Sequence, residues 1–322
     1  MAGILLLVRC KREAAVNPIQ NYSLELNPTG YAPLTAQLRF NTTDPTKVNI
    51  RVKGRNGIDS DYVKDYTEPA RSWSIPVVGL YQRSTNEITI TVSDPFGEVL
   101  EVREETILTP PLSEDMPEVI VETTSGTDEL QMYLVYYFGF REGGDFLPQR
   151  PFAFDQYGAI RWYLDFRQHP TLNTLFYDNG LTIMENGNFI MGDGRTGALY
   201  EINRLGEVVN SWSLQGYGFH HHVIEKPNGN FLVTVNDFSK PTVEDVIIEI
   251  ARQSGDIIRT WDLNESLNNQ RRAWPTDLAD LEMDWFHAYG LAFDPSDNSI
   301  LVSGRTQGVV KLKGNNDVTW IM

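Results

Sequence analysis

The chain contains five histidines, and four of them stand in two short motifs that are typical of ligand binding or catalysis. His220, His221 and His222 are consecutive and lie just ahead of a polar turn, and His287 occupies the corresponding place in a later repeat. Imidazole exchanges protons near neutral pH, binds metals, donates to anions and attacks electrophiles. The fifth, His169, stands beside aromatic residues and is interpreted as a packed, hydrogen-bonded side chain.

Two arginines repeat in the same way as the histidines. Arg195 and Arg305 stand at equivalent positions of the similar segments Gly192–Thr196 and Val302–Thr306. Surface ion pairs would explain arginines at these positions equally well. Their equivalence favours a second interpretation, in which guanidinium and imidazole groups meet around an anionic ligand.

A metal centre, a nucleotide site and a serine nucleophile are not expected. Alternate side chains of a strand point to opposite faces, so His220, His221 and His222 are not expected to converge on one ion. No cysteine or paired carboxylate motif stands near them. The glycine-rich segment Gly192–Gly197 lacks the Lys-Ser/Thr ending of a P-loop, and no Gly-x-Ser-x-Gly elbow occurs. We therefore predict no metal and no cofactor.

The elements that position these residues form a repeat of about fifty residues in the C-terminal part. Each copy has a polar turn, two apolar strand-like runs and a strand that carries a tryptophan. The tryptophans are Trp162, Trp212, Trp261 and Trp320. This period is near that of a four-stranded propeller blade. Equivalent loops of successive blades converge on one end of the central channel, so the two histidine motifs should meet there.

The full chain is predicted to be all-β, with three to four propeller blades preceded by a sandwich. Residues 18–108 alternate β-branched and polar residues between Gly, Pro and Asn turns, a pattern that suits an immunoglobulin-like β-sandwich. Residues 109–117 contain prolines and are interpreted as a linker, and residues 118–322 as a partial β-propeller. Two further strands are expected at Glu118–Glu122 and Met132–Phe138, and one short helix near Leu278–Met283. The polar segment Asn264–Arg272 is interpreted as a loop insertion.

Charge and composition limit the partners. The net charge of −16 disfavours nucleic acid, which is bound by clustered Lys and Arg. The sequence contains no run of eighteen apolar residues, so we expect no transmembrane helix. Residues 1–17 resemble a short signal or lipoprotein remnant, or a disordered segment, with Cys10 as the candidate lipid site; Arg9 stands where such a signal needs a small residue.

Several motifs together resemble the bacterial arylsulfate sulfotransferases, which act without a nucleotide donor. The resemblance runs from about residue 18 to the end of the sequence. The matching segments are Asn27–Ala36, Gly158–Leu164, Phe219–His221 with Pro227–Asn230, and Asp284–His287 with Ser303–Arg305. It implies a six-bladed propeller with an N-terminal sandwich-like domain. The family moves a sulfuryl group from an aryl sulfate donor to a phenol acceptor through a sulfohistidine.

The resemblance also implies roles for individual residues. His287 is expected to contact the sulfuryl oxygens and to donate a proton, and Arg305 with His220 or His221 is expected to bind the same group. Tyr289 stands where the family has an asparagine, and its phenol can still donate one hydrogen bond. His222 replaces the aspartate of the family's His-His-Asp motif. The family's nucleophilic histidine lies in a later blade, and none of the five histidines here matches it.

Two functions of different class follow. In the first, the chain is a sulfotransferase sequence that is inactive as written, because the nucleophile and the ring-closing blades are missing. In the second, it is a non-catalytic module that binds an anionic or aromatic ligand or a protein. The open blades favour self-association, so a homo-oligomer is expected. By the resemblance, the protein is exported to the periplasm or the cell surface.

Overall fold

The computed structural model describes residues 18–123, 129–136, 149–175, 178–268 and 283–322. Nearly all of the regular structure in these residues is β, which confirms the predicted class. No helix in the described ranges is long and apolar enough to cross a membrane. The candidate signal segment with Cys10, and residues 278–282 of the expected helix, lie outside the described residues.

The first part of the chain folds into a five-stranded antiparallel sheet. Its elements are β1 (Gln20–Leu26), β2 (Ala36–Val52), the 3₁₀ helix η1 (Ile58–Ser60), β3 (Tyr62–Val77), β4 (Thr85–Ser93) and β5 (Val99–Leu108). The long strand β2 pairs with β1 before Thr42 and with β4 from Lys47 onward. Every second residue of β2 beyond this point is buried, including Val48, Ile50 and Val52. This alternation is the pattern that the sequence predicted for a half-buried strand.

The segment that follows departs from the expectation. Glu118–Glu122 forms no strand, so that prediction was wrong. The segment instead passes so close to Gly158 that a Cβ there would lie 2.8 Å from the Val119 carbonyl oxygen. A three-stranded sheet has the order β6 (Met132–Val135), β7 (Phe152–Asp155) and β8 (Ile160–Tyr163).

The chain divides into two compact units that interleave in sequence. One contains the described residues up to Pro28 together with Leu34–Met132 and Phe154–Trp162. The other contains Thr29–Pro33, Tyr133–Ala153 and Tyr163–Met322. The histidine motifs all belong to the second unit.

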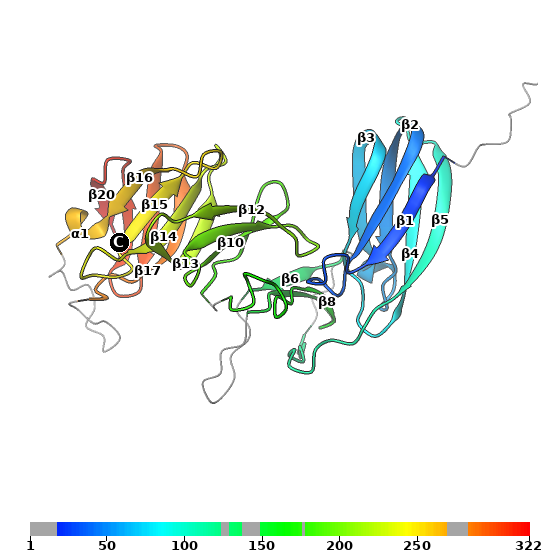
Figure 1. Ribbon diagram of the computed structural model, residues 1–322, viewed down its shortest axis with the longest axis horizontal. Coiled ribbons are helices and arrows are strands. Elements are labelled where there is room, and N and C mark those ends of the chain that lie inside the picture. The colour runs from blue at the N-terminus through cyan, green and yellow to red at the C-terminus, as the bar shows by residue number, and fades with distance from the viewer. Residues whose placement is uncertain (1–17, 124–128, 137–148, 176–177, 269–282) are drawn as a thin grey trace, which may run out of the picture. The chain divides into compact units, whose positions relative to one another are not determined.

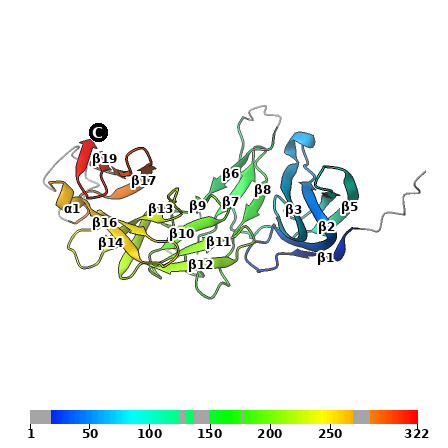
Figure 2. The same ribbon diagram turned by 90° about the horizontal axis from the view of Figure 1, so that it is seen from above.

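The second unit contains three four-stranded antiparallel sheets in which consecutive strands are neighbours (Figures 1 and 2). The first consists of β9 (Thr182–Ile183), β10 (Phe189–Asp193), β11 (Ala198–Ile202) and β12 (Val208–Ser213). The second consists of β13 (Tyr217–Glu225), β14 (Phe231–Asp237), β15 (Val246–Ile250) and β16 (Ile257–Asp262). The third consists of β17 (Ala288–Asp294), β18 (Ser299–Gly304), β19 (Gly308–Leu312) and β20 (Val318–Ile321). This up-and-down order is that of propeller blades.

The blades pack through buried apolar clusters between successive sheets. Strand β13 contacts β10 of the preceding blade and β17 of the following one. The repeated tryptophans strengthen this packing. Trp212 Nε1 donates to the Arg252 carbonyl at 2.7 Å, and Trp261 Nε1 donates to the Lys313 carbonyl at 2.8 Å. Trp212 and Trp261, each on the fourth strand of its blade, are thus bonded to the turn after the third strand of the next blade.

The expected loop insertion begins as a helix. α1 (Leu263–Ser266) follows β16 directly, and the Asp262 carboxylate caps its first turn by accepting from the Asn264 amide. A capping aspartate at this position favours a helical turn over an irregular loop. Residues 269–282 of the insertion lie outside the described part of the chain.

Candidate functional site

The two histidine motifs meet in one cavity of about 600 Å³ in the second unit. Residues from all three blades line it: Asp178, Gly194, Arg195, Gly218, Phe219, His220, His221, Asn236, Phe238, Glu244, His287 and Arg305. A cavity of this size with converging polar groups is typical of a small-molecule site.

A bulge in β13 turns two consecutive histidines toward the cavity. Phe219 pairs with Val235 and Val223 pairs with Val233, so three histidines lie opposite the single residue Thr234. The buried Thr234 hydroxyl donates to the His220 carbonyl and accepts from the His222 amide at 3.0 Å. A bulge re-aims side chains that strand alternation would separate.

The backbone at the site adopts an unusual conformation. His221, Glu244 and His287 have φ angles of 51°, 60° and 55°. Positive φ is uncommon for residues other than glycine and occurs often at functional sites. His287 directly precedes β17, whose pairing with β18 is also irregular near its start. An irregular pairing thus lies at or beside the histidines of two successive blades, within β13 in one and at the start of β17 in the other.

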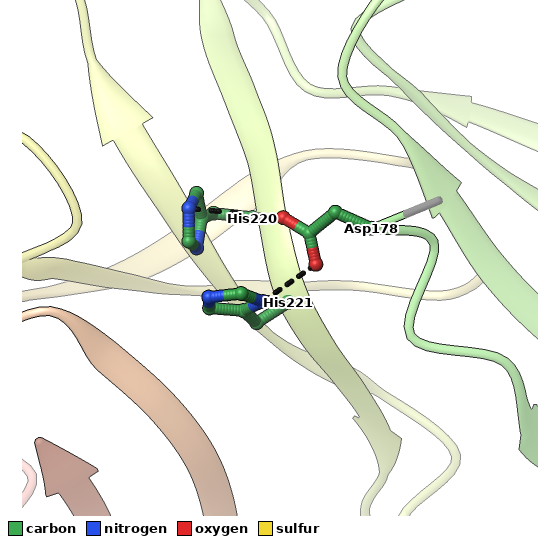
Figure 3. A group of neighbouring side chains, drawn as sticks. All are labelled: Asp178, His220 and His221. Carbon is green, nitrogen blue, oxygen red and sulfur yellow. Dashed lines mark hydrogen bonds and ion pairs between the residues drawn. The ribbon is translucent and has the colours of Figure 1, made fainter. Parts of the chain in front are cut away.

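Asp178 bridges His220 and His221 of β13 (Figure 3). Its Oδ1 lies 2.6 Å from His221 Nδ1, and its Oδ2 lies 3.7 Å from His220 Nε2. The rings of His220 and His221 meet edge to face with centroids 3.9 Å apart. Because a carboxylate accepts, His221 donates from Nδ1, and its Nε2 is the ring nitrogen that does not bond Asp178.

Two further carboxylates hold His287. Its Nδ1 lies 2.9 Å from Asp284 Oδ2 and also contacts Glu244. Glu244 Oε1 lies 2.5 Å from His220 Nε2, and Asp284 Oδ2 accepts from Arg305 Nη2 at 2.8 Å. The three carboxylates therefore connect the basic side chains His220, His221, His287 and Arg305 of the cavity lining.

These contacts set the charge of the site. Burial disfavours the imidazolium of His287, but hydrogen bonds to Asp284 and Glu244 outweigh burial and raise its pKa to about 9. Burial also opposes ionisation of Glu244, but hydrogen bonds from His220 and His287 lower its pKa to about 2. At neutral pH, His287 is therefore a cation and Glu244 an anion.

A line of hydrogen bonds follows from these assignments. His221 Nε2 and His287 Nε2 lie 3.1 Å apart. The charged His287 carries a proton on Nε2, which either His221 Nε2 or a bound anion can accept. The line from Asp178 through His221 and His287 to Asp284 can shift a proton or direct an N–H group at an anion.

Ligand-type atoms lie close enough in this cluster to consider a metal ion. The sets Asp178, His220 and His221, and His221, Glu244 and His287, each have such atoms within 4.8 Å of one another. The argument that neighbouring histidines of a strand diverge does not apply, because the bulge brings His220 and His221 together. Each of these carboxylates already bonds an imidazole, so we assign no metal ligand, and the absence of a metal stays a prediction.

The structure brings together four of the five candidate residues. These four are His220, His221, His287 and Arg305, which all line the cavity. The resemblance implied His220 or His221, and the structure places both of them in the lining. Tyr289 is not among the lining residues, but its ring centroid lies 4.5 Å from that of His221 and its surface is 56% exposed.

The structure also places His222 and Arg195, the two motif residues to which no role in sulfate binding was assigned. His222 lies on the other side of the bulge, where its Nδ1 accepts from the Leu291 amide at 2.9 Å and so connects two blades. Burial is the main cause that lowers the pKa of His222, and His222 is therefore neutral at pH 7. Arg195, which the repeat placed as the equivalent of Arg305, also lines the cavity.

The sequence reasoning missed the three carboxylates. Asp178 precedes a strand of only two residues and belongs to no recognisable repeat. Glu244, however, lies in the turn between β14 and β15, and Arg195 and Arg305 lie in the same turn of the neighbouring blades. Aligning the three turns would have indicated Glu244 as a site residue.

The sequence matches two family descriptions that together cover most of the chain. Residues 23–110 match the arylsulfotransferase Ig-like domain, and residues 121–322 match arylsulfotransferase (ASST). The chain is 26% identical to the arylsulfate sulfotransferase AssT of Lelliottia amnigena, covering 93% of this chain and 63% of that protein. It is also 26% identical to the AssT of Escherichia coli O6:H1, covering 92% of this chain and again 63% of the relative. The chain thus spans less than two thirds of the length of these curated relatives.

Solved structures give a weaker likeness. A selenomethionine-substituted virginiamycin B lyase from Staphylococcus aureus aligns with 14% identity and a TM-score of 0.36, covering 84% of this chain and 73% of the lyase. A likeness at this level carries no argument about function.

Proposed function

The chain belongs to the arylsulfotransferase family, and on this premise we propose that its histidine cavity binds the sulfuryl group of an aryl sulfate for transfer to a phenol. The observation that supports this most is the charged His287, held between Asp284 and Glu244 with its Nε2–H at the cavity. Arg305 and Arg195 add two guanidinium groups to the same lining. Fixed cationic donors stabilise the charge that sulfuryl oxygens carry through transfer.

The proposed chemistry assigns each group a step. A neutral imidazole nitrogen attacks sulfur, the bond from sulfur to the phenolic oxygen breaks, and the phenolate leaves with the electron pair. The oxygen of a second phenol then bonds to sulfur and gives up its proton, while the sulfur–nitrogen bond breaks and the imidazole is regenerated. His287 and Arg305 hold the sulfuryl oxygens. The linked pair His221 and His287 gives a proton to the leaving phenolate and takes one from the acceptor phenol.

We further propose that the attacking histidine is not among the five in this sequence. His169 lies outside the cavity lining, and His222 bonds to a neighbouring strand. Glu244 bonds His220, and Asp178 bonds His221. His287 is bonded by carboxylates and lies against the ring of His221. The 322 residues would then bind the sulfuryl group without becoming sulfated. Export to the periplasm or cell surface belongs to the same proposal.

The test is intact-mass analysis with 4-nitrophenyl sulfate and a photometric assay of 4-nitrophenol release. We expect neither a sulfo adduct nor turnover from a folded sample. A stable adduct would mean that one of the five histidines is the nucleophile. Peptide mapping would identify it, and His169→Gln would serve as the matched control because His169 is not among the lining residues.

Tyr289 favours a second candidate, a module that binds its ligand without catalysis. Its exposed phenol stands where the family resemblance implies an asparagine that contacts sulfate. Tyr289→Asn separates the two functions in a calorimetric titration. Tighter binding of inorganic sulfate by the variant supports the sulfuryl site, whereas weaker binding of phenyl sulfate with unchanged sulfate binding supports the module.

A further inference from the structure

Phe238 lines the cavity but has no role in the charge network. Phe238 follows β14 directly, and 72% of its surface is exposed. The other aromatic residue of the lining, Phe219, is only 4% exposed because it packs in the core between blades. The remaining lining residues are glycines or carry polar or charged side chains. Among the lining residues that the structure describes, Phe238 is therefore the one phenyl ring with an open surface.

A glycine sets the position of this ring. A Cβ added at Gly218 would lie 2.6 Å from Phe238 Cζ and 3.3 Å from Cε2, so the ring lies directly over the glycine backbone. Gly218 belongs to β13 and precedes His220 by two residues. The ring is thus seated beside the strand that presents the histidines, and any larger residue at 218 would displace it.

We propose that Phe238, seated on Gly218, forms a subsite for the aromatic ring of the ligand. This proposal rests on the proposed function, in which the sulfuryl group of the same ligand lies at His287 and Arg305. The lining combines a charged cluster with one exposed ring, so it suits a ligand that is anionic at one end and aromatic at the other. Two stacked or edge-to-face rings gain affinity beyond the area that they bury.

The ring subsite makes a prediction about ligand choice. Phenyl sulfate and methyl sulfate carry the same anionic group and differ in the ring. In calorimetric titrations of the full chain, Phe238→Ala should weaken phenyl sulfate binding by about 2- to 10-fold, the range expected for one aromatic pair. Methyl sulfate binding should not change. Phe238→Tyr retains the ring and should bind both ligands as the unmodified protein does.

A second variant moves the ring of Phe238 without removing it. Gly218→Ala displaces Phe238 and should reproduce the selective loss for phenyl sulfate. Phe96→Ala is the matched control, since Phe96 is 97% exposed and lies between β4 and β5 of the first sheet. It should leave both affinities unchanged.

The outcomes separate the subsite from the function on which it rests. If the unmodified protein binds both sulfates and Phe238→Ala weakens neither or both equally, the ring subsite is wrong and the sulfuryl site stands. If the unmodified protein binds neither sulfate, the proposed function fails and the subsite fails with it. Selective loss of phenyl sulfate in both variants establishes the subsite.

Discussion

At the scale of single residues, the site is governed by which imidazole nitrogen faces which carboxylate. Asp178 accepts from Nδ1 of His221, and Asp284 and Glu244 accept from Nδ1 of His287, so both Nε2 atoms face inward and meet. Carboxylates behind the rings fix tautomers and favour the charged state of one ring. A cavity with three carboxylates in and beside its lining can therefore still direct a cation at an anionic ligand.

The charge of His287 predicts how ligand binding depends on pH. Its pKa of about 9 lies above the ordinary value of 6.5, so the imidazolium persists through neutral pH and is lost as the pH rises through about 9. Phenyl sulfate affinity should fall over that range, and the His287→Gln variant should lack the fall. Titrations between pH 7 and about 10 measure it.

The same shift predicts a change in stability. A raised folded-state pKa contributes stability that is fully present below the unfolded value near 6.5 and disappears as the pH rises through about 9. Urea unfolding curves of the unmodified protein and of His287→Gln should therefore converge at high pH. A gap between the two curves that stays constant from pH 6 to about 10 would contradict the assigned charge.

At the scale of elements, the bulge in β13 decides whether two neighbouring histidines share one cavity. The buried Thr234 hydroxyl bonds main-chain groups on both sides of His221. Thr234→Val keeps the shape and leaves those groups unpaired, so we predict a loss of about 1–3 kcal/mol in the free energy of unfolding. Phenyl sulfate binding should weaken as well. Thr260→Val on the exposed face of β16 is the control, with a change within about 0.5 kcal/mol.

The tryptophans predict where the blades are held together. Trp212→Phe keeps an aromatic ring but leaves the Arg252 carbonyl without its 2.7 Å donor, so unfolding should become easier by about 1–3 kcal/mol. Trp320 occupies the same place in the third blade but is 37% exposed, against 5% for Trp212. Trp320→Phe should therefore change stability by less than about 0.5 kcal/mol. Equal losses in both variants would show that the bond between blades contributes nothing.

The elements also show what sequence reasoning can and cannot reach. The blade strands were predictable because apolar runs, glycine turns and tryptophans recur at a fixed period. The meeting of His287 with the His220–His222 motif followed from that period alone. The shared orientation of His220 and His221 did not, because it depends on a register shift opposite Thr234. Asp178 was equally hidden, since a single carboxylate before a two-residue strand carries no pattern.

At the scale of the whole molecule, strongly acidic composition coexists with a local group of cations. The net charge of −16 describes the surface as a whole, whereas Arg195, Arg305 and His287 converge on one cavity. A small anionic ligand is therefore compatible with the acidic composition, and its binding stays a prediction. The domain boundaries at residues 18–108, 109–117 and 118–322 stay predictions, as does the number of blades in a closed ring.

Exposed apolar residues of the third blade predict association. Trp320, Ile321 and Met322 are 37%, 38% and 80% exposed on or beside β20, an edge strand of its sheet. Edge strands with apolar side chains invite pairing. Light scattering coupled to size-exclusion chromatography should show a mass that rises with protein concentration, and Ile321→Lys should reduce it. A concentration-independent monomer would contradict this prediction.

The central claim is that the cavity of His220, His221, His287 and Arg305 binds the sulfuryl group of an aryl sulfate. The most direct test is a calorimetric titration of the full chain with phenyl sulfate at pH 7, in parallel with folded His287→Gln. We predict one binding site per chain in the unmodified protein and about 10-fold weaker binding in the variant, which loses a hydrogen bond from a charged donor. Absence of binding in the unmodified protein, or equal affinity in the two proteins, would contradict the account.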